Sequence, residues 1–348
     1  MTGRSTNVLS RSISRIFTEA KKPAPFKLLF LLFVLVATLC GSIQAQQDAC
    51  RYRTIAVNVL SEDVHLVEGL STPNFRGKVH GHPVEIESVN RDADPRRIVI
   101  VLDASGSMGE FWKLEVSAAE GLISADRCSS FALVIFAGRI EHRIDFAQSR
   151  EKLSALLAGI EWPSKDNPGG GTALRDGLAA ALDLLLPAQS GDAIYLVSDV
   201  HDNASKVSNS QLKEVVANSG ARLFALIPVE STALRGRTAE EAEGPEWLTG
   251  FVRATGGDFT IFRLGIDSPA VYNLKPNVAV PIGRTGQQVM SLATEGFDKE
   301  ITDFYRLTLK LPEPLDKPRE LDLDVVDANR KKNNRWLIVY PHRLAACP

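Results

Sequence analysis

The sequence predicts an α/β protein with a doubly wound, mostly parallel central sheet flanked by helices, and a small β module built from the two ends of the chain. Continuous apolar runs over residues 97–102, 131–136 and 193–197 have the length and composition of strands buried on both faces. Segments with apolar residues at helical spacing alternate with these runs. This alternation is typical of a parallel sheet covered by helices.

The β module is predicted from alternating apolar patterns outside this region. Residues 54–60 alternate like a strand, and similar patterns return near the C-terminus over residues 304–311, 320–326 and 336–340. We therefore divide the chain into four parts: a leader over 1–45, an N-terminal β segment over 46–94, the α/β domain over 95–266, and a helix with a C-terminal β segment over 267–348 that packs with 46–94.

The leader predicts export. Six basic side chains precede an apolar run from Leu28 to Cys40, and small residues follow it up to Ala45. This order is typical of a secretory signal peptide. The alternative is a signal anchor, because the segment extended to Ala45 approaches the roughly 20 apolar residues that a membrane span needs. We expect a secreted or periplasmic protein, which touches a membrane only if the leader stays uncleaved and leaves the domain facing outward.

The charge of the chain argues against nucleic acid as a partner. The 348 residues carry a formal net charge of −2, and the leader holds six basic residues and one acid. Without the leader the chain keeps 34 basic and 41 acidic side chains, a net charge of about −7. An acidic chain without a basic cluster lacks the cations that neutralise the phosphates of nucleic acids.

Three cysteines lie beyond the leader, and no pair of them has the spacing of a zinc site. Cys50 and Cys347 bracket the mature chain, and export would permit a disulfide between them. The alternative is two free thiols in frayed termini. Cys128 comes shortly before a buried strand, so we expect an inert thiol in the core.

The candidate site begins directly after the strand over residues 97–102, with the sequence Asp103-Ala104-Ser105-Gly106-Ser107. Ligands of open α/β sheets bind beyond the carboxyl ends of the strands. A carboxylate and two hydroxyls at alternate positions offer only oxygen atoms, the ligands that Mg²⁺ prefers. Two more oxygen-bearing residues come later in the chain: Thr172 follows a run of three glycines, and Asp199 follows the strand over 193–197.

The pattern Asp-x-Ser-x-Ser, followed in order by the threonine and the second aspartate, resembles the metal-ion-dependent adhesion site (MIDAS) of von Willebrand factor A (VWA) domains. The preceding β segment resembles the lead-in of VWA-related proteins of acidobacteria. The resemblance implies that a Mg²⁺ or Mn²⁺ ion is bound directly or nearly so by Ser105, Ser107 and Thr172, and often through water by Asp103 and Asp199. It also implies that a partner protein supplies an acidic side chain to the metal, as in adhesion or in protein–protein interaction in the cell envelope.

One residue of this region departs from the family pattern. VWA domains usually have glycine directly after the last aspartate, whereas this chain has Val200. This side chain could constrain the loop, but it removes no ligand. For His201 and Asp202, which follow, we favour a solvated loop end over a role beside the metal.

The motifs argue against an enzyme. A serine hydrolase needs Gly-x-Ser-x-Gly, but Ser105 stands where the first glycine would precede Ser107. The sequence contains neither the phosphate-binding Gly-x-x-x-x-Gly-Lys-Ser/Thr nor the zinc-binding His-Glu-x-x-His. We interpret residues 80–82, His-Gly-His, as a hairpin turn and not as a metal site. The alternatives to a binding module are a metal-assisted hydrolase and a structural envelope subunit with an idle metal site.

Overall fold

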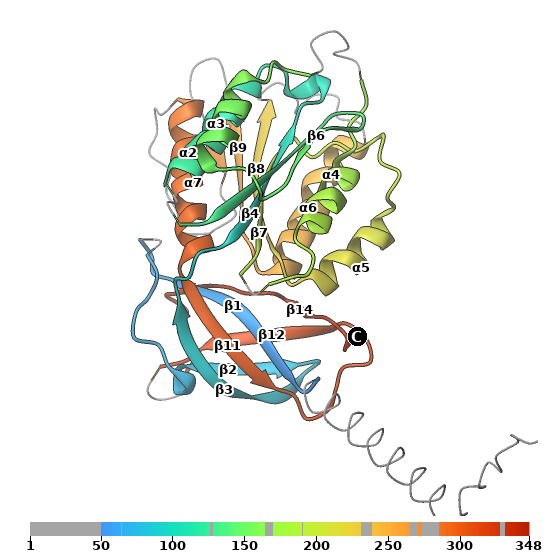
Figure 1. The fold of residues 1–348 in the computed structure, drawn as a ribbon. Coiled ribbons are helices and arrows are strands. Elements are labelled where there is room, and N and C mark those ends of the chain that lie inside the picture. The colour runs from blue at the N-terminus through green and yellow to red at the C-terminus, as the bar shows by residue number, and fades with distance from the viewer. Residues whose placement is uncertain are drawn as a thin grey trace, which may run out of the picture. The chain divides into compact units, whose positions relative to one another are not determined.

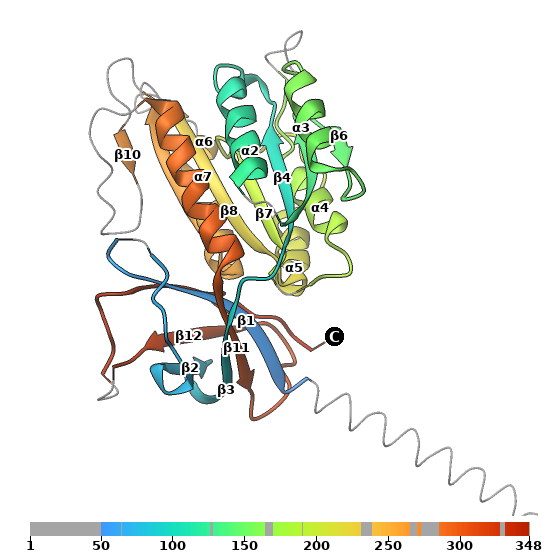
Figure 2. The ribbon, with the colours of Figure 1, turned by 60° about the vertical axis from the view of Figure 1, so that its left-hand side comes forward.

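The structure, a computed structural model, describes residues 50–63, 65–125, 128–163, 170–189, 191–230, 239–264, 270–272, 285–327 and 331–347. These residues form two seven-stranded sheets (Figures 1 and 2). The predicted leader lies outside the described residues. Among the helices that are described, none combines the length and the apolar character needed to cross a bilayer.

The first sheet is the predicted α/β sheet, with the strand order β10-β9-β8-β7-β4-β5-β6. Its five central strands are parallel, and the edge strands β6 and β10 are antiparallel to their neighbours. The chain passes from β4 to β5 on one side and later returns to β7 on the other. This reversal makes the β4–β7 boundary the topological switch point, where ligands of such sheets bind. The bounds are β4 (Arg97–Asp103), β5 (Ser130–Phe136), β6 (Ile140–Ile144), β7 (Ala193–Val197), β8 (Arg222–Glu230), β9 (Phe259–Leu264) and β10 (Ala270–Tyr272).

Helices cover both faces of this sheet (Figure 1). One apolar core joins the sheet to α2 (Trp112–Ala125), α3 (Arg150–Gly159) and α7 (Gly286–Thr302), and the other joins it to α4 (Leu174–Leu184), α5 (Asn209–Ser219) and α6 (Ala239–Thr255). Strand β4 serves both cores, because Ile98, Ile100 and Leu102 point into the first and Val99 and Val101 into the second. Two buried faces explain why this strand is a continuous apolar run.

Helix α7 occupies a different place from the one expected. The sequence grouped it with the C-terminal strands, whereas its buried residues Val289, Met290, Phe297 and Ile301 belong to the core of the α/β sheet. Its start follows from its capping box, in which the Thr285 side chain accepts a hydrogen bond from the backbone N–H of Gln288. The strands that follow α7 leave this core and join the second sheet.

The second sheet is antiparallel, with the order β13-β1-β11-β3-β2-β12-β14. Segments from both ends of the chain pair with each other in it, since β1 pairs with β11 and β2 pairs with β12. The prediction of a small module is corrected here, because this sheet has as many strands as the α/β sheet. The bounds are β1 (Tyr52–Leu60), β2 (Phe75–Val79), β3 (His82–Asp92), β11 (Phe304–Lys310), β12 (Arg319–Val325), β13 (Leu337–Val339) and β14 (Arg343–Leu344).

The hairpin between β2 and β3 turns at His80 and Gly81. Both have positive φ, 50° and 80°, and Val79 pairs with His82 across the turn. Two successive residues with positive φ are typical of the two-residue turns that suit the twist of antiparallel strands. Both imidazoles are exposed. The interpretation of residues 80–82 as a hairpin turn is confirmed.

A buried arginine links the two sheets. Arg222, the first residue of β8, donates hydrogen bonds to Asn58 Oδ1 at 3.0 Å and to the carbonyl oxygens of Glu300 and Ile301 at 3.0 and 2.9 Å. The guanidiniums of Arg222 and Arg96 lie over the ring of Phe304, at 4.3 and 4.5 Å from its centre. These contacts join β1 and β11 to the amino-terminal end of the parallel sheet.

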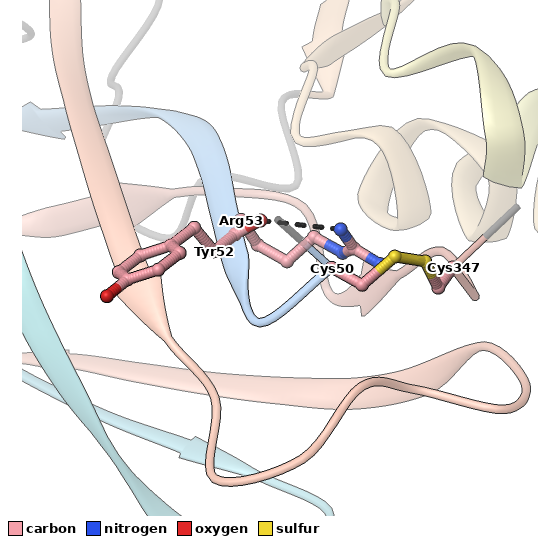
Figure 3. The surroundings of a disulfide bond; sticks show 4 residues. All are labelled: Cys50, Tyr52, Arg53 and Cys347. Carbon is pink, nitrogen blue, oxygen red and sulfur yellow. Dashed lines mark hydrogen bonds between the residues drawn. A yellow bond between two sulfur atoms is a disulfide. The ribbon is translucent and has the colours of Figure 1, made fainter. Parts of the chain in front are cut away.

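The termini of the second sheet are joined by a disulfide between Cys50 and Cys347, whose Cα atoms are 5.6 Å apart (Figure 3). The segment after β11 holds both cysteines in place, because the Leu311 N–H donates to the carbonyl oxygen of Arg51 and the Cys347 N–H donates to that of Leu315. The remaining described cysteine, Cys128, is exposed. The expectation of a core thiol at Cys128 is therefore wrong, because the buried part of β5 begins only at Phe131.

Candidate metal site

The two aspartates of the predicted site meet at the switch point of the α/β sheet. Asp103 is the last residue of β4, and Asp199 lies two residues past β7. These strands are parallel neighbours, with Leu102 paired to Val197. The carboxyl ends of neighbouring parallel strands lie at the same edge, so the fold brings together two loops that are almost a hundred residues apart in sequence.

Hydrogen bonds fix Asp103 within these loops. Its side chain is completely buried. Its Oδ1 accepts a hydrogen bond from the Ser105 backbone N–H at 3.0 Å, and its Oδ2 accepts one from the Ser198 hydroxyl at 2.6 Å. The hydroxyls of Ser105 and Ser107 are 3.3 Å apart. The residues after β4 therefore present one carboxylate and two hydroxyls as a compact group of oxygens.

Thr172 reaches the same edge on the loop before α4. The N–H of Ala173 donates to the carbonyl oxygen of Ala137, just past β5, at 2.7 Å. The Thr172 N–H donates to Asn203 Oδ1 at 2.8 Å, and the Thr172 carbonyl accepts from the Asn203 N–H at 3.0 Å. This reciprocal pair ties the threonine loop to the loop that carries Asp199.

Close packing at glycine explains how these loops approach each other. A Cβ on Gly171 would lie 2.7 Å from the Cβ of Ala204 and 3.0 Å from Asn203 Oδ1. Real side chains do not approach so closely, so the backbone contact depends on the missing side chain. Of the glycines before Thr172, the last one, Gly171, is therefore required by close packing.

Val200 adopts a backbone conformation that suits glycine. Its φ is +69°, although it is β-branched, and its side chain is buried in the core beside α4. A β-branched residue in this region of φ is an outlier. Valine therefore replaces the usual glycine of the family pattern, but the backbone keeps the positive φ that suits glycine. The Val200 N–H donates to the Ser198 hydroxyl at 2.9 Å, which links the strained residue to the group that binds Asp103.

The two aspartates differ in pKa. Burial, and then the negative charge of Asp199, raise the pKa of Asp103 to about 7. Burial also acts to raise the pKa of Asp199, but the hydrogen bond and the charge of His201, together with a hydrogen bond from Ser107, lower it below its ordinary value. Asp199 is therefore the carboxylate that stays ionised, and Asp103 is the one that takes up a proton near neutral pH.

Glu115 is a third carboxyl group at this site, and the sequence analysis missed it. It is completely buried in α2, its Oε2 accepts a hydrogen bond from the Asp103 backbone N–H at 3.2 Å, and its Oε1 has no partner among the described residues. Burial, and then the charge of Asp103, raise its pKa well above the ordinary value. The helical spacing already indicated that Glu115 is buried, because it lies three residues after Trp112 and three before Ala118, on the buried stripe of the helix.

His201 and Asp202 are not a solvated loop end, contrary to the interpretation favoured above. The Nδ1 of His201 is 3.2 Å from Asp199 Oδ2. Asp202 Oδ2 accepts hydrogen bonds from the Arg175 N–H at 2.8 Å and from the Ser205 hydroxyl at 2.7 Å. The His201 side chain therefore contacts Asp199, and the Asp202 side chain links the Asp199 loop to the first turn of α4.

The chemistry of these residues fits a hard divalent cation. Within the described residues, no group of three or more His, Cys, Asp or Glu side chains is arranged to hold a metal, so a cation at this edge needs the hydroxyl oxygens as ligands. The serines and the threonine supply such oxygens, and Asp199 supplies negative charge, which Asp103 joins when it loses its proton. Among the described residues, no arginine or lysine forms an ion pair with Asp103. A cation would offset the cost of burying that charge.

Comparison with known proteins places residues 74–255 in the family described as "VWA domain containing CoxE-like protein". Similar solved structures include an aerotolerance-related membrane protein from Bacteroides fragilis NCTC 9343, with 16% identity, 59% of this chain and 98% of that chain covered, and a TM-score of 0.40. BatB from Bacteroides thetaiotaomicron has 16% identity, the same coverage and a TM-score of 0.38. A von Willebrand factor type A protein from Catenulispora acidiphila has 14% identity and a TM-score of 0.31, with 85% of this chain and 74% of that chain covered. The comparison with curated proteins finds no match.

Proposed function

Since the chain belongs to the family of VWA-domain-containing CoxE-like proteins, we propose that it is an exported binding module and not an enzyme, and that it holds a partner protein through a Mg²⁺- or Mn²⁺-dependent site. Asp103, Ser105, Ser107, Thr172 and Asp199 form this site. One observation carries the proposal. It is supported by the pairing of β4 with β7, which puts the loop of Asp103, Ser105 and Ser107 beside the loop of Asp199, where the Ser198 hydroxyl donates to Asp103 at 2.6 Å and a hydrogen bond from Ser107 lowers the pKa of Asp199.

The roles of the residues follow from their contacts. Ser105 and Ser107 offer hydroxyl oxygens 3.3 Å apart, and the neighbouring loops offer Thr172 and Asp199. Ser198 and the Ser105 N–H hold the Asp103 carboxylate in one orientation. When bound, a divalent cation supplies a coordination position for a carboxylate oxygen of the partner. Few ionised ligands in the protein leave the cation electrophilic, which favours an acidic side chain from the partner.

Thermal melting of the purified chain with Mg²⁺ and with EDTA tests metal binding. A ligand that binds only the folded state stabilises it by about 2.7 kcal/mol at a hundredfold excess over its dissociation constant. We expect this stabilisation in the wild type and its loss in Asp103→Asn, which keeps the shape of the side chain. Asp316→Asn, an exposed aspartate of an ion pair with Arg319, is the matched control and should respond like the wild type. Equal melting with Mg²⁺ and EDTA in the wild type would refute the metal site.

Capture of a partner tests the binding function. The immobilised chain is incubated with an extract of the native cell envelope, once with Mg²⁺ and once with EDTA. We expect a protein that is retained with Mg²⁺, released by EDTA and not retained by Asp103→Asn. Metal binding without any chelator-sensitive partner would favour the structural subunit with an idle site.

Export is tested in the native host by fractionation and N-terminal sequencing. The basic and apolar leader predicts a mature N-terminus near Gln46 and a protein outside the cytoplasm. An intact leader in the membrane fraction would favour the signal anchor, and recovery from the cytoplasm would contradict export altogether.

A further inference from the structure

Trp162 lies against the loop that carries the two serines of the candidate metal site. It stands three residues past the end of α3, and its side chain packs, partly buried, on the core that joins the α/β sheet to α2, α3 and α7. Its indole N–H donates a hydrogen bond to the carbonyl oxygen of Ala104 at 3.0 Å. Ala104 separates two of the proposed ligands, Asp103 and Ser105, so this contact is made within the ligand sequence itself.

The peptide unit between Ala104 and Ser105 is held on both sides. Its carbonyl oxygen accepts from Trp162, and its N–H, that of Ser105, donates to Asp103 Oδ1 at 3.0 Å. Because a peptide unit is planar, the donor that fixes the carbonyl also fixes the direction of this N–H. Ala104 is completely buried, so loss of the indole would leave its carbonyl oxygen unpaired, which is costly. The indole N–H therefore helps to orient the group that binds the Asp103 carboxylate.

The ring of Trp162 also packs against the other end of the serine loop. A Cβ on Gly109 would lie 2.7 and 2.8 Å from two carbons of the six-membered ring. Real contacts are longer, so the ring fills the space that a side chain at this position would need. One indole therefore contacts the loop just before Ser105 and again after Ser107. The two hydroxyls, 3.3 Å apart, belong to the stretch between these contacts.

A second tryptophan joins the same two segments. Trp112, the first residue of α2, donates its indole N–H to the carbonyl oxygen of Ile160 at 3.4 Å. The segment over residues 160–162 thus donates to the start of the serine loop and accepts from the helix that follows it. Two crossed contacts hold the loop more firmly than either could alone, because both would have to break before the loop could swing away.

We propose that Trp162 is a positioning residue of the metal site, which keeps Ser105 and Ser107 in the conformation that binds the cation. It is not a ligand, and it acts through Ala104 and Gly109. When this conformation is less populated, the apparent Kd for the cation rises by the reciprocal of the competent fraction. The inference rests on the proposed metal-dependent function, to which it adds a residue outside the five ligands.

Titration with Mg²⁺, followed by thermal melting, tests this role in Trp162→Phe, which keeps an apolar ring but has no N–H. We expect an apparent Kd about tenfold higher than in the wild type, and a similar rise in Gly109→Ala, which pushes the ring away. Trp247→Phe is the matched control and should keep the wild-type Kd. Trp247 is also partly buried and donates its indole N–H to Asn209, but it lies in α6, in the other core of the sheet. If Trp162→Phe does not fold, Gly109→Ala gives the result.

Hydrogen–deuterium exchange in EDTA measures the loop without metal. Peptides that cover residues 103–110 should exchange faster in Trp162→Phe than in the wild type or in Trp247→Phe, whereas peptides from the second sheet should exchange alike. A lower melting temperature with unchanged Kd and unchanged exchange in this loop would show that Trp162 only fills the core, and the inference would be wrong. A wild type that binds Mg²⁺ no better than Trp162→Phe overturns this inference alone, whereas a wild type that binds no Mg²⁺ overturns the proposed function as well.

Discussion

At the scale of single residues, Val200 combines a strained backbone with a buried side chain. A positive φ costs a β-branched residue about 1–2 kcal/mol. Burial of a valine side chain contributes about 1.5–3 kcal/mol in the opposite direction. Since the side chain is almost completely buried, the apolar contribution outweighs the strain. The valine is therefore tolerated, and it fixes the loop that carries Asp199 more firmly than glycine would.

Substitution of glycine for Val200 tests this balance. We expect Val200→Gly to reduce the free energy of unfolding by about 1–2 kcal/mol, because the lost burial and the added freedom of glycine exceed the relief of strain. Val197→Gly is the matched control, since Val197 is equally buried but lies in β7. The control should cost at least about 1 kcal/mol more, because no strain is relieved there. Denaturant unfolding measures both, and equal losses would contradict strain at Val200.

The raised pKa of Asp103 predicts a characteristic pH dependence. Its pKa of about 7 in the folded, metal-free protein exceeds the roughly 3.9 of an unfolded chain. Such a group binds its proton more tightly when folded, so the free energy of unfolding falls as pH rises from about 4 to 7. In EDTA, we expect the wild type to lose about 2 kcal/mol relative to Asp103→Asn between pH 5.5 and 8.

The same group predicts that Mg²⁺ stabilises more at high pH. Protons compete with the cation for Asp103 below its pKa, so the stabilisation by Mg²⁺ should be larger at pH 8 than at pH 5.5. Melting at both values, with Mg²⁺ and with EDTA, measures it. An equal stabilisation at both pH values would show that Asp103 does not take part in metal binding.

At the scale of elements, the site depends on the contact between two loops that belong to different strands. Gly171 lies against Ala204 and Asn203, and Asn203 holds both backbone groups of Thr172. A side chain at Gly171 must push this contact apart. The threonine would then move away from Asp103 and Asp199, although no ligand is removed.

Gly171→Ala should therefore weaken Mg²⁺ binding by at least about tenfold, or about 1.4 kcal/mol. Gly159→Ala is the matched control, because a Cβ there meets nothing within 4 Å. Titration of each variant with Mg²⁺, followed by thermal melting, gives the apparent Kd. A Kd that is unchanged in Gly171→Ala would mean that the loop contact does not position Thr172.

At the scale of the whole molecule, the disulfide closes almost the entire described chain. Cys50 and Cys347 are 297 residues apart in sequence, and hydrogen bonds of Arg51 and Cys347 to the segment after β11 bring them together. In the chain-entropy model a loop of this length stabilises the folded state by up to about 5 kcal/mol, mainly because it restricts the unfolded chain. The second sheet depends most on this effect, since it is built from strands at both ends of the sequence.

Reduction should therefore lower the melting temperature of the wild type. Cys50→Ser/Cys347→Ser should melt at the lower temperature with or without reductant, whereas Cys128→Ser should respond like the wild type. Peptide mapping of protein from the native host, without reductant, checks the pairing directly. Free, alkylatable Cys50 and Cys347 in exported protein would contradict the bond.

Local patterns in the sequence determined the α/β sheet and the candidate ligands. A strand buried on both faces must be apolar at every position, as in β4, so its composition and its end can be read without any partner. The positions of Asp103 and Asp199 past such strands predict their meeting, because parallel strands end at the same edge. The family identification rests on these residues and is confirmed.

Features that depend on distant partners could not be predicted from the sequence. The pairing of β1 with β11 joins segments about 250 residues apart, and no local pattern specifies which exposed edge a strand will choose. The approach of Glu115 to Asp103 and the positive φ of Val200 are likewise properties of the packed chain. Alternation in sequence encodes which face of an element is buried, but partners, pKa values and pockets arise only when the elements meet.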